Sequence, residues 1–183
     1  MTVPANSRRT LRVKPVLVRS SVRSAKTFDS SVTYLSDLQE FAAQRGVGLP
    51  TPIFVKDRSF HGGVILLNGT SYSKGLGLAA NTVILYDLNR QYQSFAALAG
   101  IAEDIASREP RGSINLTIFC DGKCQFDSGS MYPDTTPQPV EVDVCNIQTL
   151  VIRVSSNWDS NGDMRNDFGN LADARLIGRA RAD

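Results

Sequence analysis

The second half of the chain alternates apolar and polar residues with a period of two, and this pattern constrains the fold most strongly. Ile114, Leu116 and Ile118 would face one side of a strand, with the polar residues between them on the other side. The same alternation recurs at residues 140–144 and 150–154. It is typical of antiparallel strands that bury one face, so we expect several such strands here.

The first half adds short strands separated by turn residues. Residues 64–67 form an apolar run that ends at Asn68-Gly69, a strong hairpin-turn signal, and further strands are expected at 83–88 and 91–100. Long helical periodicity is almost absent, with one short helical stretch at most within residues 31–41. The sequence therefore predicts an all-β fold, an antiparallel, jelly-roll-like β-sandwich.

A basic N-terminal segment precedes this body. Residues 1–28 contain no acid and seven basic residues, which are Arg8, Arg9, Arg12, Lys14, Arg19, Arg23 and Lys26. Residues 29–183 keep 13 basic and 18 acidic residues, so the two parts carry opposite net charges. We therefore divide the chain into an extended basic arm, 1–28, and a sandwich domain, 29–183. Such an arm contacts a partner of opposite charge or remains a solvated tail.

Composition argues against several classes of protein. No run approaches 18 consecutive apolar residues, and the N-terminus lacks the apolar stretch of a secretory signal, so neither a transmembrane helix nor a signal peptide is expected. A catalytic triad needs a histidine as its base, and His61 is the only histidine in the chain. A triad is therefore a poor hypothesis, and we expect His61 to be structural. The three cysteines, Cys120, Cys124 and Cys145, leave at least one thiol free, and whether Cys120 pairs with Cys124 stays open. We expect no enzyme.

Several ordered segments carry a recognisable pattern. They are Leu67-Asn-Gly-Thr-Ser-Tyr-Ser-Lys-Gly-Leu-Gly77, Phe95-Ala-Ala-Leu-Ala-Gly-Ile101, Phe126-Asp-Ser-Gly129 and Leu171-Ala-Asp-Ala-Arg-Leu176. Together, over about residues 34–177, they resemble the novel putative carbohydrate-binding module (NPCBM) family, which overlaps the family 51 carbohydrate-binding modules. The resemblance implies a β-sandwich and non-catalytic recognition of sugars, although a fold does not by itself transfer a function.

The chain departs from this family at the motifs that resemble a sugar site. The family typically writes G-L-G-T-H-A where this chain has Gly75-Leu-Gly-Leu-Ala-Ala80, so Ala79 replaces a histidine. It typically writes D-H-A-D-W-A-D-A where this chain begins with Asp167, so Phe168, Asn170 and Leu171 replace a histidine, an aspartate and a tryptophan. Sugar sites combine polar groups with an aromatic face, so we expect this site to be altered or lost.

Candidate glycan-binding residues nevertheless remain near these motifs. They are Lys74, Asn81, Trp158, Asp167 and Asn170. Trp158, the only tryptophan, is a stacking surface for a sugar, an anchor at a protein interface, or a lid on one end of the sandwich. It lies in a loop where Asp159, Asn161 and Asp163 offer oxygen ligands, so calcium is a possible cofactor, although the spacing does not match an EF-hand.

These observations support two main functions. The lost motif residues and the basic arm favour a structural protein in a multicopy assembly, such as a virion decoration or coat-accessory protein, whose arm binds other subunits, among them copies of itself. The alternative is a free-standing carbohydrate-binding module that recognises glycans. Nucleic acid is a poor partner, because the body is acidic and the arm lacks an aromatic residue before Phe28 for base stacking. No membrane contact is expected, and the localisation is open, with a virion or surface assembly suspected.

Overall fold

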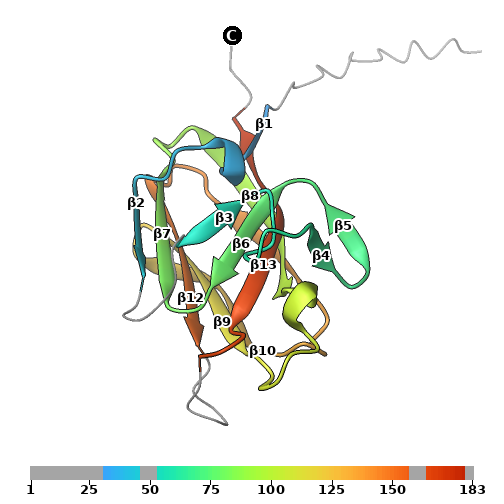
Figure 1. The fold of residues 1–183 in the computed structure, drawn as a ribbon. Helices are drawn as coiled ribbons and strands as arrows, with labels where there is room; N and C mark the ends of the chain where they lie inside the picture. Colours follow the sequence, from blue (N-terminus) through green and yellow to red (C-terminus); the bar gives the residue numbers. More distant parts are fainter. Residues whose placement is uncertain (1–30, 46–52, 157–163, 180–183) are drawn as a thin grey trace, which may run out of the picture.

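The computed structural model describes residues 31–45, 53–156 and 164–179, and two antiparallel sheets make up most of this part (Figure 1). The six-stranded sheet has the order β11 (Gln138–Asp143), β8 (Tyr92–Ile101), β13 (Phe168–Gly178), β6 (Gly75–Ala79) and β3 (Phe54–Lys56), and β1 (Val32–Tyr34) pairs with the end of β13. The five-stranded sheet has the order β10 (Lys123–Met131), β9 (Ile114–Cys120), β12 (Thr149–Ser156), β7 (Thr82–Asp87) and β2 (Ala42–Arg45). The predicted all-β sandwich is confirmed.

Three short elements complete the described chain. β4 (Ile65–Leu67) and β5 (Thr70–Tyr72) form a separate hairpin, and two 3-10 turns occur at η1 (Leu35–Asp37) and η2 (Glu103–Ile105). The β4–β5 turn has Asn68 and Gly69 both at positive φ, as the Asn-Gly signal predicted. The helical stretch expected within residues 31–41 amounts to one 3-10 turn, which β1 and β2 flank.

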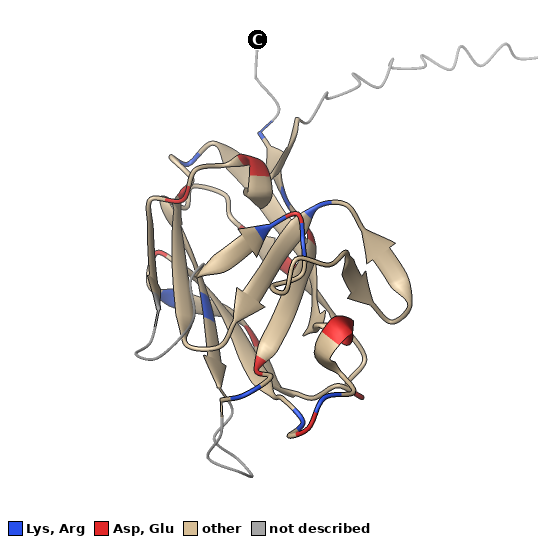
Figure 2. Ribbon diagram, viewed as in Figure 1, with Lys and Arg blue, Asp and Glu red and all other residues tan. Residues whose placement is uncertain are grey.

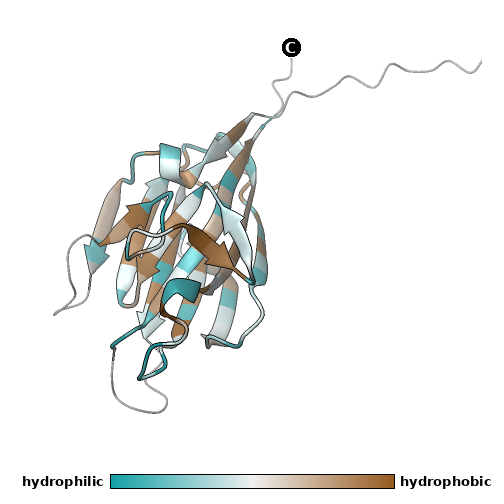
Figure 3. Ribbon diagram, turned by 45° about the vertical axis from the view of Figure 1, so that its right-hand side comes forward, coloured by the Kyte–Doolittle hydropathy of each residue, from teal (hydrophilic) through white to brown (hydrophobic). Residues whose placement is uncertain are grey.

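The core lies between the two sheets, because each strand turns its apolar residues inward. Ile118, Ile152 and Ile84 lie at paired positions across β9, β12 and β7, and all three are fully buried. Leu76 and Leu171 approach from the opposing sheet in the same cluster. The alternation of apolar and polar residues along the strands is visible in Figure 3.

The β4–β5 hairpin covers part of the outer face of the six-stranded sheet, which is the face turned away from the five-stranded sheet. Ile65 and Leu67 form a second buried cluster with Ala172, against which Tyr72 and Leu98 pack. The hairpin thus covers the outer face near the middle of β13. Among the described residues no helix is long and apolar enough to cross a membrane.

The cysteines lie at positions that exclude a pair between Cys120 and Cys124. Cys120 is opposite Lys123 and Cys124 is opposite Phe119 on the β9–β10 hairpin, so the two side chains do not face each other. All three cysteines are free, with Cys120 buried and the other two exposed. Burial, and then the charges of Asp121 and Asp143, raise the pKa of the Cys120 thiol to about 11.

This arrangement predicts the order in which thiols react. At pH 8 the exposed Cys124 should be alkylated readily, whereas Cys120 should react only after unfolding, since it is both buried and protonated. Mass spectrometry of alkylated peptides, with and without denaturant, measures both sites in one sample. Equal labelling of Cys120 and Cys124 in the folded protein would contradict the placement.

A core substitution tests the inward direction of β13. Leu171→Ala should lower the free energy of unfolding by about 2–5 kcal/mol, because it removes a fully buried side chain from the core. Val64→Ala, at a side chain that is 64% exposed, serves as the control and should change stability by less than about 0.5 kcal/mol. Urea unfolding followed by tryptophan fluorescence or circular dichroism gives both values, and equal effects would show that Leu171 does not face the core.

Candidate functional site

Strand pairing brings the altered motif positions together on the outer face. Ala79, at the end of β6, lies opposite Phe168, at the start of β13, and Gly77 lies opposite Asn170. These two strands carry motifs that are far apart in the sequence, and the sheet pairs them as neighbours. The positions of Ala79, Phe168 and Asn170 therefore belong to one region of the protein.

A loop crosses directly over this region. A side chain at Gly77 would place its Cβ 2.4 Å from both the Arg58 carbonyl oxygen and the Phe60 backbone nitrogen, so only glycine permits this approach. The loop is closed by backbone hydrogen bonds from Ser59 to the Gly63 carbonyl and from Gly62 to the Ser59 carbonyl. The buried Ser59 hydroxyl also donates to Asp104 Oδ1 at 2.8 Å. The loop is thus fixed to the sheet and to η2.

The fixed loop places three aromatic rings side by side. Phe60 stacks on Phe168 with ring centroids 4.8 Å apart, and His61 meets Phe168 edge-on at 4.6 Å. Phe60 and Phe168 are half-buried, whereas His61 is exposed. We call Phe60, His61 and Phe168 the aromatic cluster, and it offers an apolar surface with an imidazole beside it.

Asp167 fixes the start of β13 beside the cluster and is itself almost inaccessible, at 3% exposed. Its Oδ1 accepts the backbone N–H of Ser113 at 2.7 Å, and its Oδ2 accepts the Ser156 hydroxyl at 2.5 Å. Its carbonyl accepts the N–H of Ala80. The side chain predicted to contact a glycan therefore ties the segments at Ser113 and Ser156 to the start of β13, and the Asp167 carbonyl adds the segment at Ala80.

Asn81 follows β6 at the same end of the sheet and stays partly exposed. Its Nδ2 donates to the Met164 sulfur at 2.9 Å, and its Oδ1 accepts the Ser156 N–H at 3.4 Å. A thioether is a weak acceptor, and the second bond is long. The Asn81 amide therefore keeps capacity to bond a ligand at this end of the sheet.

Asn170 lies beneath the loop and is 1% exposed. Within the described part of the chain, neither its Oδ1 nor its Nδ2 has a hydrogen-bond partner. An unpaired buried amide carries a free-energy cost of about 1–3 kcal/mol.

Lys74 lies at the other end of β6 and takes part in a different cluster. Its Nζ bonds Asp37 Oδ1 at 2.5 Å and Asp57 Oδ2 at 2.9 Å, and it lies 5.7 Å from the centroid of the Tyr34 ring. The hydrogen bonds to Asp37 and then Asp57 raise the pKa of Lys74. The structure thus separates Lys74 from Asn81, Asp167 and Asn170, and assigns it to the junction of η1, β3 and β6.

Other predicted residues fall elsewhere. Trp158 and the calcium candidates Asp159, Asn161 and Asp163 lie outside the described residues, as does the whole arm. In the described part, no three His, Cys, Asp or Glu residues gather as a metal site. Leu171 was counted as a lost sugar-site aromatic, and that interpretation is wrong, because its side chain points into the core and is fully buried.

The sequence did not reveal the aromatic cluster. The lone His61 was expected to be structural, and Phe168 was read only as the loss of a histidine. The missing information was the register of β6 and β13 and the path of the loop over Gly77, which bring residues 60–61 to residue 168. A hollow of about 570 Å³ also borders this loop, lined by Arg58, Val64, Tyr72 and neighbouring residues.

The structural role of Asp167 can be tested directly. Asp167→Ala should lower the free energy of unfolding by about 1–3 kcal/mol, because the buried Ser113 N–H loses its acceptor. Asp127→Ala is the matched control, since Asp127 is exposed and, among the described residues, accepts from Asn115 and Gly129. Urea denaturation compares the two, and similar losses of stability would contradict the structural role of Asp167.

Comparison with known proteins agrees with this fold. The solved structure of the CBM51 from Clostridium perfringens GH95 in complex with methyl-galactose is 33% identical to this chain, with 80% of this chain and 99% of that chain covered and a TM-score of 0.70. The CBM51-2 and INT domains of Clostridium perfringens ZmpB, solved in complex with GlcNAc, are 27% identical, with 81% of this chain and 32% of that chain covered and a TM-score of 0.71.

A third structure shares the fold. The tandem CBM51 modules of the family 98 glycoside hydrolase Sp3GH98 from Streptococcus pneumoniae are 23% identical, with 84% of this chain and 49% of that chain covered and a TM-score of 0.72. No curated protein matches the chain. The sequence profile of the NPCBM/NEW2 domain matches residues 31–177. The chain therefore belongs to the NPCBM/NEW2 domain family, the resemblance that its ordered motifs indicated.

Proposed function

We propose that this protein is a non-catalytic carbohydrate-binding module whose ligand contacts the aromatic cluster. The observation that carries the proposal is the grouping of Phe60, Phe168 and an exposed His61 at the accessible end of the six-stranded sheet. Aromatic rings bind the apolar face of a sugar, while a neighbouring polar group bonds its hydroxyls. The solved relatives in complex with methyl-galactose and GlcNAc support the same class of ligand.

The polar contacts of such a site come from the rim and from the loop. His61 can donate or accept at its ring nitrogens, and Asn81 has an amide that is only weakly engaged. Asn170 was also predicted to contact a glycan, but its amide is buried beneath the fixed loop and does not reach a ligand on the aromatic cluster while the loop stays in place. Nothing in this arrangement requires a chemical step, since hydrogen bonds and stacking are enough to hold a sugar.

This proposal reverses the order of the two functions drawn from the sequence. The assembly role rested on lost motif residues, and one of these, Leu171, faces the core. Another, Phe168, exchanges a histidine for an aromatic ring that packs beside the His61 imidazole. The relatives are sugar-binding modules, and none of those compared concerns a virion or a multicopy assembly. Glycan binding is therefore the better supported function.

A glycan-array screen of the full chain, followed by titration calorimetry with methyl-galactoside and with GlcNAc, tests the proposal. The array finds the ligand and the calorimetry measures its affinity. We expect a hit on the array, and His61→Ala should weaken its binding by about tenfold, the loss of about 1.4 kcal/mol of contact free energy. Phe41→Ala is the matched control, because Phe41 is exposed and lies in the segment before β2.

Trp158→Ala is a separate variant, since Trp158 was predicted to contact a glycan and lies outside the described residues. A loss of binding in Trp158→Ala with no change in His61→Ala would contradict the placement at the aromatic cluster. A protein that binds no glycan on the array would overturn the proposed function.

A further inference from the structure

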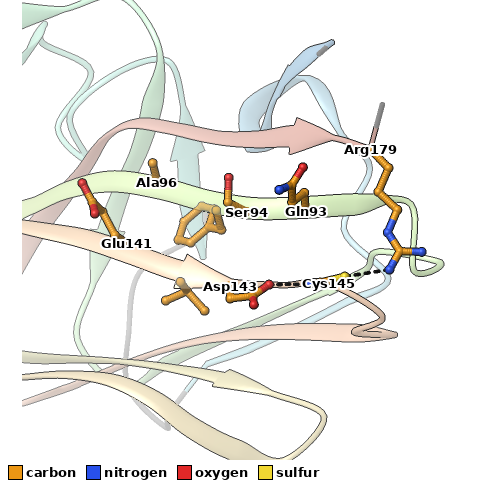
Figure 4. A pocket seen from close by; sticks show the side chains of 9 residues that line it. Gln93, Ser94, Ala96, Glu141, Asp143, Cys145 and Arg179 are labelled. Carbon is orange, nitrogen blue, oxygen red and sulfur yellow. Dashed lines mark hydrogen bonds between the residues drawn. The ribbon is translucent and has the colours of Figure 1, made fainter. Parts of the chain in front are cut away.

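A second hollow lies at the far end of the six-stranded sheet, away from the aromatic cluster. Its volume is about 790 Å³, and it lies along β8 and β11 near the end of β13 (Figure 4). We call it the edge groove, and its lining residues include Gln93, Ser94, Ala96, Glu141, Asp143 and Arg179. β11 is the edge strand of this sheet, so the groove follows an edge of the sandwich.

The register explains why the sheet is hollowed here. Glu141 lies opposite Ala96 and Asp143 lies opposite Ser94, and all four point to the outer face because Val142 and Phe95 between them are buried in the core. The small side chains of Ser94 and Ala96 form a low floor. The two carboxylates form one wall, and β13 borders the other side, where Arg175 lies opposite Ala96 and is paired with Asp173.

The carboxylate wall lacks cationic partners within the described residues. Glu141 and Asp143 form no ion pair there, and Asp143 Oδ1 only accepts the N–H of Cys145 at 2.8 Å. Arg179, at the end of the groove, donates to the Cys145 sulfur at 2.7 Å and to Asn146 Oδ1 at 2.6 Å. Elsewhere Lys and Arg are interspersed with Asp and Glu (Figure 2). The edge groove is thus suited to a cationic, extended occupant.

The chain itself supplies such a segment beside the groove. Ser31 accepts the N–H of Gly178 at 2.8 Å, and Gly178 precedes Arg179, which lines the groove. The residues before Ser31 contain the seven cations of the arm and a single acid, Asp29. The arm therefore joins the described domain at the end of the groove that carries Arg179 and Cys145.

The arm is also long enough. Val32, Ile177, Ser94 and Asp143 are successive cross-strand neighbours, so Val32 lies about 14 Å from Asp143 at ordinary strand spacing. Residues 19–30 can span up to about 40 Å when extended. A tethered segment has an effective concentration in the millimolar range, so modest intrinsic affinity is enough for it to occupy the groove ahead of a second copy.

We propose that the edge groove binds the arm of the same chain, through residues 19–28, with Arg19, Arg23 and Lys26 paired to Glu141 and Asp143. The bound arm covers the strip of β8 that lies between β11 and β13 on the outer face. This interaction is independent of the aromatic cluster and of glycan binding.

Alkylation of the full chain tests the proposal, because Cys145 lines the groove while Cys124, equally exposed, lies on the other sheet. A maleimide should react with Cys145 about tenfold faster in the variant Arg19→Glu/Arg23→Glu/Lys26→Glu than in the native chain. This factor is expected if the native arm covers Cys145 about nine-tenths of the time and the variant arm does not bind. Salt at about 1 M should give a similar increase by screening the charges. The rate at Cys124 should stay unchanged, and equal rates at Cys145 in both proteins would overturn the proposal.

A cross-link identifies which chain occupies the groove. Ser24→Cys introduces the only cysteine of the arm, and mild oxidation should join it to Cys145 within one chain, which gives a monomer of altered mobility on a denaturing gel. Cys145→Ser in the same background should abolish the product. A disulfide-linked dimer would overturn the proposal and assign the groove to the arm of a second copy, and a link to Cys124 would also contradict it.

Discussion

The close approach of a loop to Gly77 determines the arrangement of the candidate site. Because Gly77 has no side chain, the backbone of residues 58–60 lies directly on β6, and Ser59 is fastened to Asp104 on the far side. That contact places Phe60 and His61 against Phe168. A larger residue at this single position would lift the loop, separate the rings and uncover Asn170, so the site depends on a glycine that touches no ligand.

β13 links the two functional regions that we propose. It begins at the aromatic cluster with Phe168 and ends beside the edge groove with Gly178, and it pairs with β6, β8 and β1 along its length. Its inward residues, such as Leu171 and Leu176, hold the core, while its outward residues meet the loop and the hairpin. The strand therefore keeps the two regions at a fixed separation, although neither shares a side chain with the other.

The sequence predicted the fold well because strand periodicity and turn residues are local signals. The alternation at 114–118 and the Asn68-Gly69 turn correspond to β9 and to the β4–β5 turn. The site was predicted less well, because it depends on contacts between distant segments. Lys74 and Asn81 are close in sequence yet lie at opposite ends of a strand, while His61 and Phe168 are far apart in sequence and touch. A match to a family motif does not show which way a side chain points, so it could not separate Leu171, which faces the core, from Asn170, which faces outward.

The junction between Ser31 and Gly178 has a geometric consequence for how the domain can be presented. Both ends of the described body leave from one pole, and the aromatic cluster lies at the other end of β13, about 33 Å away for an extended strand of this length. A tether at either terminus, whether a natural linker or a surface in a binding assay, therefore leaves the aromatic cluster pointing away from the point of attachment. The points of attachment and the candidate binding site thus lie at opposite ends of the domain.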